Sequence, residues 1–89
     1  MPRRSLVEVD KAQVVVEAIK RAEDSDAVIV RLYEAWGGHC RARLTTTLPV
    51  RRAFLCDLLE RDRGEVAVDG GELELELSPF KILTLKLIP

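Results

Sequence analysis

The chain has 89 residues, 47% of them hydrophobic and 33% charged, with a formal net charge of -1. One folded domain with a modest core is expected, and the composition excludes the low-hydrophobicity, high-charge regime of disordered chains. The balance of basic and acidic residues argues against nucleic acid as a partner, and the apolar runs are too short for a membrane-spanning helix. Because no signal-peptide apolar stretch follows Met1, the expected location is cytoplasmic and no membrane partner is expected.

The first patterned segment, residues 10–24, fits a helix and a strand almost equally well. Asp10 is a suitable N-cap, Gln13 follows three residues later, and apolar side chains recur at helical spacing. On the other side, Val14–Val16 is a β-branched run, and the apolar residues also alternate as they do in a strand. The residues themselves leave both interpretations open.

The region between residues 28 and 48 is predicted to form two strands joined by a glycine turn. β-Branched and aromatic residues favour a strand over residues 28–35, and Gly37-Gly38 supplies the backbone freedom for a hairpin. On the first strand one face is predicted to carry Val28, Val30 and Leu32. On the second strand the covered face is predicted to carry Cys40, Ala42, Leu44, Thr46 and Leu48.

The rest of the chain also favours strands. Residues 50–64 mix helical and alternating patterns, whereas Asp69-Gly70-Gly71 between two alternating runs predicts a hairpin. Ser78-Pro79 is predicted to separate two final strands, because proline cannot donate to a ladder. Several short strands with regular turn signals favour an all-β fold, an antiparallel β-sandwich in a single small domain.

Charged residues on these strands are interpreted as surface features. Glu72, Glu74 and Glu76 are expected to pair with Lys81 and Lys86 on the next strand rather than to act in catalysis. A second prediction concerns a polar interface toward a partner domain, formed by Arg41, Arg43, Arg51 and Arg52.

The rare residues between positions 33 and 56 suggest few reactive sites. Cys40 and Cys56 are expected to be reduced thiols, and with His39 they lack the spacing of metal ligands, so no cofactor or metal is expected in this chain. Neighbouring strand residues point to opposite faces, which separates His39 from Cys40. Trp36 is the one candidate carbohydrate contact, since an aromatic face suits the apolar side of a pyranose. The simpler interpretation is that Trp36 covers the end of the sandwich.

An ordered set of motifs resembles the C-terminal β-domain of the α-mannosidases of glycoside hydrolase family 38. The motifs are "VVVEAIKRAEDSDAVIVRLYEAWG", "DLLERD" and "ELELELSPFKILTLKL", and the resemblance extends from about Ser5 to Ile88. It implies a β-sandwich, so the segment "QVVVEAIKRAED", residues 13–24, is expected to be a strand and not a helix. Asp24, Ser25 and Asp26 are then expected to form an acidic turn, and "CDLLERDRG" is expected to be a strand that ends in a polar loop.

The family hydrolyses α-linked mannose with retention, using two carboxylates and a divalent metal, typically zinc, in an N-terminal catalytic domain. The resemblance therefore implies that residues 1–89 are an excised, non-catalytic C-terminal accessory domain whose partners are the other domains of the parent enzyme. In that enzyme it would pack on the catalytic part and stabilise it. Two alternatives stay open: a carbohydrate-binding module that contacts a mannose-containing glycan through Trp36, and an interaction domain unrelated to sugars.

Overall fold

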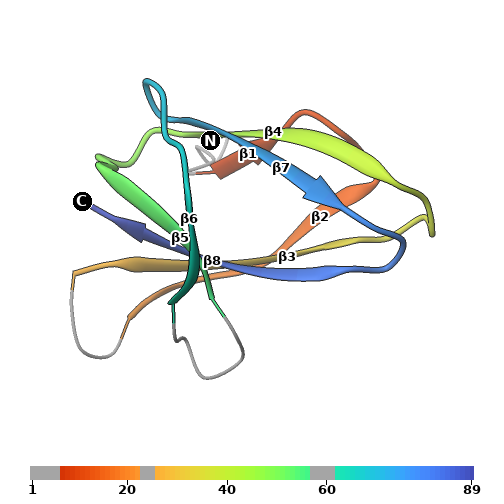
Figure 1. Cartoon of the computed structure of the whole chain (residues 1–89), viewed down its shortest axis with the longest axis horizontal. Coiled ribbons are helices and arrows are strands. Elements are labelled where there is room, and N and C mark those ends of the chain that lie inside the picture. The colour runs from red at the N-terminus through yellow and green to blue at the C-terminus, as the bar shows by residue number, and fades with distance from the viewer. Residues whose placement is uncertain (1–6, 23–25, 57–61) are drawn as a thin grey trace, which may run out of the picture.

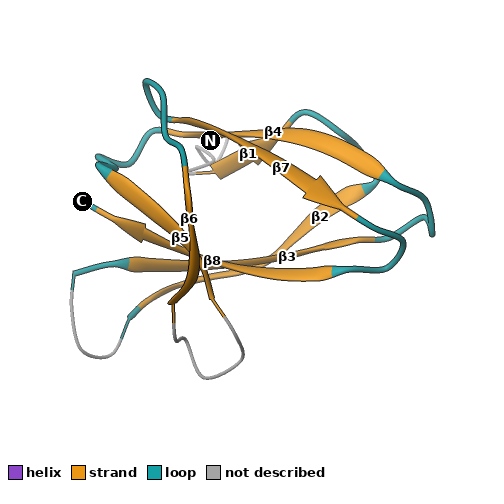
Figure 2. Ribbon diagram, in the orientation of Figure 1, coloured by secondary structure: helices purple, strands orange, loops and turns teal. Residues whose placement is uncertain are grey.

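The computed structural model describes residues 7–22, 26–56 and 62–89, and these residues form two layers of antiparallel strands (Figures 1 and 2). The strands are β1 Val7–Val9, β2 Val14–Arg21, β3 Val28–Glu34, β4 Cys40–Thr46, β5 Arg52–Cys56, β6 Asp62–Val66, β7 Glu72–Leu77 and β8 Ile82–Ile88. The smaller sheet has the order β1-β4-β7 and the larger one has the order β2-β3-β8-β5-β6. The predicted antiparallel β-sandwich is confirmed. Within the described ranges, no helix is long and apolar enough to span a membrane.

The core lies between the two sheets and is built mainly from alternate residues of the strands. The smaller sheet contributes residues such as Leu44, Leu73 and Leu77, and the larger sheet contributes Leu32 and Leu85. Side chains of this size stabilise the fold by about 1.5–3 kcal/mol each when fully buried. The alternation predicted for residues 28–35 and 40–48 is confirmed over β3 and β4, which end at Glu34 and Thr46, because one face of each strand lies in this core. Leu48 lies beyond the end of β4.

The described part of the ambiguous segment at residues 10–24 contains a strand, β2 Val14–Arg21, as the resemblance implied, and no helix. β2 pairs with β3, and the register shifts between Val16 and Ala18, so that Glu17 is an extra residue in β2. Such a bulge interrupts the period of two. The helical and strand patterns fitted this segment almost equally well because the strand changes its alternation in the middle.

Neither predicted glycine hairpin pairs its two flanking strands. The Gly37-Gly38 turn joins β3 of the larger sheet to β4 of the smaller one, and the Asp69-Gly70-Gly71 turn likewise follows β6 of the larger sheet and precedes β7 of the smaller one. At the second turn only the bridge between Asp69 and Glu72 forms, through two backbone hydrogen bonds of 3.0 Å. The local turns are present, but the chain crosses between layers there instead of continuing one ladder.

The predicted pairing of the glutamates in β7 with lysines is wrong. β7 pairs with β4, so that Glu76 lies opposite Arg41 and Glu74 lies opposite Arg43, while Lys86 belongs to the other sheet. The Nε atom of Arg43 is 3.9 Å from Oε1 of Glu72. These groups are exposed, and such surface ion pairs contribute about 0–1 kcal/mol.

The predicted arginine interface is also divided by the topology. Arg41 and Arg43 lie on β4 of the smaller sheet, whereas Arg51 precedes β5 and Arg52 begins it in the larger sheet. They therefore do not form one surface. The predicted acidic turn falls partly on residues 23–25, and the predicted polar loop after β5 falls partly on residues 57–61, which lie outside the described residues.

Candidate functional site

A buried carboxylate organises one end of the sandwich. Glu34 is the last residue of β3 and shares the inward face with Val30 and Leu32, and its side chain is completely buried. A buried charge is stable only where hydrogen-bond donors replace the water it has lost. The surroundings of Glu34 supply those donors from three segments of the chain.

Both oxygens of Glu34 accept hydrogen bonds. Oε1 accepts from the backbone N–H groups of Gly37 (2.7 Å), Gly38 (3.1 Å) and Phe80 (2.9 Å). Oε2 accepts from the backbone N–H of Trp36 and from Nε2 of Gln13, both at 3.0 Å. One side chain thus fastens the β3–β4 turn, the β7–β8 turn and the segment before β2 to each other. We call this arrangement the Glu34 cage.

The cage keeps Glu34 ionised. Burial opposes the charged form and raises the pKa of this carboxyl, but the hydrogen bond from Phe80 and those from Gln13, Gly38 and Gly37 favour the anion. Their combined effect lowers the pKa of Glu34 from its ordinary value of 4.5 to about 2. With five donors occupied at its two oxygens, this group is positioned to hold the turns and not to transfer a proton to a substrate.

The two turns pack closely at the cage. Gly37 has a φ of 84°, and a Cβ atom at this position would lie 2.8 Å from Cζ of the Phe80 ring. Phe80 itself has a φ of 59°, which side-chain-bearing residues rarely adopt. The Glu34 hydrogen bond to its N–H therefore holds an uncommon backbone conformation in place.

Apolar side chains project outward beside the cage. Trp36 is 69% exposed, Phe80 is 68% exposed and Ile82 is 57% exposed. Trp36 and Phe80 thus have solvent-facing rings on backbones whose N–H groups are held by Glu34, which is the arrangement that a platform for a ligand or partner needs. Tyr33 lies nearby in β3, opposite Ile82 of β8 and Val15 of β2.

The other candidate residues from the sequence are not brought together. Cys40 is buried in β4 of the smaller sheet, Cys56 lies in β5 of the larger sheet, and both are free cysteines. His39 is exposed. Among the residues that the structure describes, no group of three or more His, Cys, Asp or Glu side chains could hold a metal ion.

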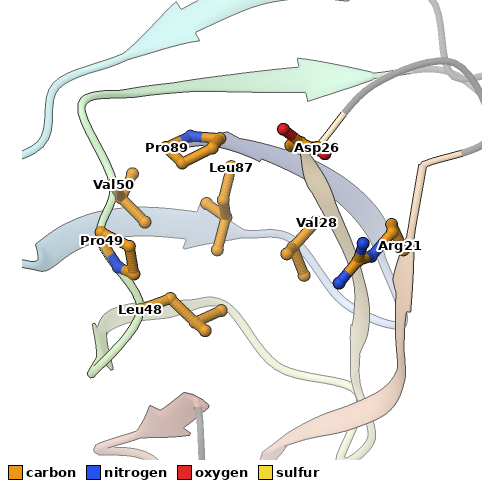
Figure 3. A pocket seen from close by; sticks show the side chains of 8 residues that line it. All are labelled: Arg21, Asp26, Val28, Leu48, Pro49, Val50, Leu87 and Pro89. Carbon is orange, nitrogen blue, oxygen red and sulfur yellow. The ribbon is translucent and has the colours of Figure 1, made fainter.

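A small cavity lies at the opposite end of β3 from the cage (Figure 3). Its volume is about 190 Å³, and its walls are mainly apolar, with Val28, Val50 and Leu87 among the lining residues and Arg21 and Asp26 also contributing. It is smaller than the 300–1,000 Å³ of typical ligand pockets. The cavity is therefore a gap at the open end of the two sheets and carries no paired catalytic groups.

The sequence interpretation did not single out Glu34. Its signal was present, because period two places it on the same face as Val30 and Leu32, and an acid at an inward position requires partners. The glycines at positions 37 and 38 supply two of them. Trp36, by contrast, was singled out, and the structure places it beside the cage.

Comparison with known proteins supports the assignment that the sandwich suggests. Residues 13–85 match the family described as "Glycosyl hydrolases family 38 C-terminal beta sandwich domain". The chain is 42% identical over 89 residues to α-mannosidase 2C1 of Homo sapiens and 43% identical to that of Mus musculus, covering 94% of this chain in each case. It is 26% identical over 88 residues to α-mannosidase G of Dictyostelium discoideum, covering 96% of this chain.

The chain spans 9% of the length of the human and mouse relatives and 8% of the length of the Dictyostelium relative. It thus corresponds to one domain of those proteins. With the two-layer fold, the matched residues and the identity to these relatives taken together, the chain belongs to the family of C-terminal β-sandwich domains of the family 38 glycosyl hydrolases.

Proposed function

We propose that this chain is the non-catalytic C-terminal accessory domain of a longer α-mannosidase-like glycoside hydrolase, in which it packs on the catalytic part and stabilises it. The observation that carries the proposal is the coverage: 94% of the chain matches relatives of which it spans 9%. Hydrolysis of α-linked mannose, with zinc or another divalent metal, then belongs to the remainder of the polypeptide. The proposal also includes a cytoplasmic location, which fractionation of cells that express the intact protein tests.

The chemistry of the described residues agrees with an accessory role. A retaining glycosidase needs two carboxyl groups about 5 Å apart on either side of the scissile bond. Glu34 is buried and bound by five donors, and the glutamates of β7 alternate along an exposed sheet face beside arginines. Neither arrangement encloses a sugar between two acids.

Deleting this domain from the intact parent enzyme tests the proposal. We expect the deletion to lower the unfolding temperature of the catalytic part and the yield of active enzyme, because an apolar docking surface becomes exposed to water. The measurements are thermal unfolding and the rate of hydrolysis of an aryl α-mannoside. The isolated 89-residue chain should release no mannose. An unchanged unfolding temperature and rate after the deletion would refute the stabilising role.

A second candidate function is carbohydrate contact at Trp36, favoured by the 69% exposure of its side chain beside a rigid turn. If it applies, mannose or mannobiose changes the fluorescence of this tryptophan, the only one in the chain, in a saturable manner. Calorimetric titration should then show that binding is lost in Trp36→Ala and kept in Ile19→Ala, an exposed apolar position on β2. A titration without a signal in the wild-type chain removes this candidate.

A further inference from the structure

The two outer faces of the sandwich differ in chemistry. On the smaller sheet, the outward residues of β4 and β7 are Arg41, Arg43, Thr45, Glu72, Glu74 and Glu76, and all of them are exposed. They have no large apolar side chain among them. This composition is that of a surface that stays in contact with water.

The outer face of the larger sheet is more apolar. Alternate residues of β3 and β8 pack in the core, so the residues between them point away from it. We use the term "outer face" for these outward positions on the two central strands: Ile29, Arg31, Tyr33, Ile82, Thr84 and Lys86. Two of them, Ile29 and Thr84, are covered by neighbouring side chains and are buried. Ile82 is 57% exposed at the start of β8, beside the β7–β8 turn, and the exposed ring of Phe80 lies two residues before it.

The outer face is also cationic. Arg31 and Lys86 occupy outward positions on β3 and β8, and these two strands carry no acid at any outward position. Lys20 of β2 is paired with Ile29 and therefore points to the same side. Near the far edge, Arg52 donates two hydrogen bonds of 3.0 and 3.1 Å to Glu65, which lower the pKa of this carboxyl.

Within the part of the chain that the structure describes, a donor on the outer face lacks an acceptor. The Nε atom of Arg31 is buried and has no hydrogen-bond partner among the described residues. Arg31 lines a small depression of about 80 Å³ together with Ala18, Lys20 and Ile29. A buried N–H without an acceptor is unfavourable, and a carboxylate that enters this depression from outside the chain would bring opposite charge to the Arg31 guanidinium.

We propose that the outer face is the surface on which the remainder of the α-mannosidase polypeptide docks, with apolar side chains covering Tyr33 and Ile82 and with a carboxylate facing the guanidinium of Arg31. This inference rests on the proposed function, since the relatives are about ten times longer than this chain and a domain of that kind has a large neighbour. The charged outer face of the smaller sheet is then directed to solvent. The Trp36 and Phe80 rings lie at the rim of the same contact.

Cleaving the intact parent polypeptide just before this domain tests the inference. An introduced protease site is cut, and size-exclusion chromatography shows whether the domain remains bound to the catalytic part. We expect the wild-type domain to remain bound, whereas Ile82→Asp and Arg31→Glu weaken the association at least tenfold. The matched controls on the other face are Thr45→Asp and Arg43→Glu, which should leave the domain bound.

The outcomes separate the inference from the function on which it rests. Release of the wild-type domain after cleavage refutes both. If the wild-type domain stays bound and the Ile82→Asp and Arg31→Glu domains also stay bound, the inference alone is overturned. Release of the two control domains overturns it as well. Circular dichroism and thermal unfolding of each isolated variant establish that it folds, and Ile82→Ser replaces Ile82→Asp if the latter does not.

The same variants also test two other functions of the outer face. If Ile82→Asp abolishes mannose binding by the isolated chain and leaves the cleaved domain bound, the face is a carbohydrate surface and docking is refuted. If light scattering shows that the isolated chain is a dimer that Ile82→Asp dissociates, and the cleaved domain stays bound, the face joins two copies of this chain instead.

Discussion

Glu34→Gln is expected to lower the unfolding temperature of the chain at pH 7 by roughly 10 °C or more, since each stranded buried donor costs several degrees in a domain of this size. Both carboxylate oxygens are occupied, Oε1 by three N–H groups and Oε2 by two. A glutamine side chain has the same shape but presents an NH₂ group at one of the two positions. Whichever way the amide is turned, donors then face donors inside a fully buried site.

The same cage predicts how stability depends on pH. The pKa of Glu34 is lowered from 4.5 to about 2 on folding, so the folded state binds this proton less readily than the unfolded state does. The contribution of the anion is complete above the unfolded pKa and is lost as the pH falls toward 2. The unfolding temperature of the wild-type chain should therefore decline between about pH 5 and pH 2, and that of Glu34→Gln should decline less.

The control for both measurements is Glu74→Gln, the same chemical change at an exposed outward position of β7. Thermal unfolding followed by circular dichroism at several pH values compares the three proteins. We expect the control to follow the wild-type curve within about 2 °C, as surface substitutions usually do. Equal unfolding temperatures for Glu34→Gln and Glu74→Gln at pH 7 would show that the cage does not stabilise the fold.

Gly71→Ala is expected to destabilise the chain by about 2–3 kcal/mol, because it combines a left-handed backbone with a steric conflict. The φ of Gly71 is 84°, and a Cβ atom there would lie 2.9 Å from the backbone oxygen of Thr46. The carbonyl oxygen of Gly71 also accepts a hydrogen bond of 2.9 Å from the N–H of Thr46. This hydrogen bond joins the turn between β6 and β7 to the end of β4, so a shift of the turn disturbs both the turn and β4.

Gly70→Ala is the matched control for this prediction. Gly70 has a φ of 60°, but a Cβ atom there meets nothing within 4 Å. Its substitution should therefore cost only the left-handed conformation, about 1 kcal/mol. Urea-induced unfolding measures the free energy of unfolding of both variants, and the two values are compared with the same slope of free energy against urea concentration. If the two variants are equally stable, the close approach to Thr46 is unimportant.

The contrast between these two glycines also shows what a sequence can and cannot specify. Asp69-Gly70-Gly71 predicts a tight turn from local backbone preferences, and the turn is present with positive φ at both glycines. Which glycine lies against another strand depends on residue 46, which is distant in the sequence. Local preferences carry no information on that contact.

The strands could also be predicted from the sequence, because side-chain alternation is a local property. Leu73, Leu75 and Leu77 alternate with glutamates, and a period of two has only one structural solution when one face is buried. β2 needed the family resemblance, because the extra residue Glu17 shifts its register and mixes two periods. The alternation identifies the buried face of each strand but not the strands that pair with it.

The amino-acid sequence by itself therefore determined the fold class, the buried face of most strands and the family to which the chain belongs. Only the tertiary structure decided which strands pair, why the Glu72–Glu76 row faces arginines of β4 and not Lys86, and that Glu34 binds three separate segments. The physical reason is that side-chain periodicity is a property of one strand, whereas sheet order and a shared buried anion depend on groups that meet only after the layers have packed.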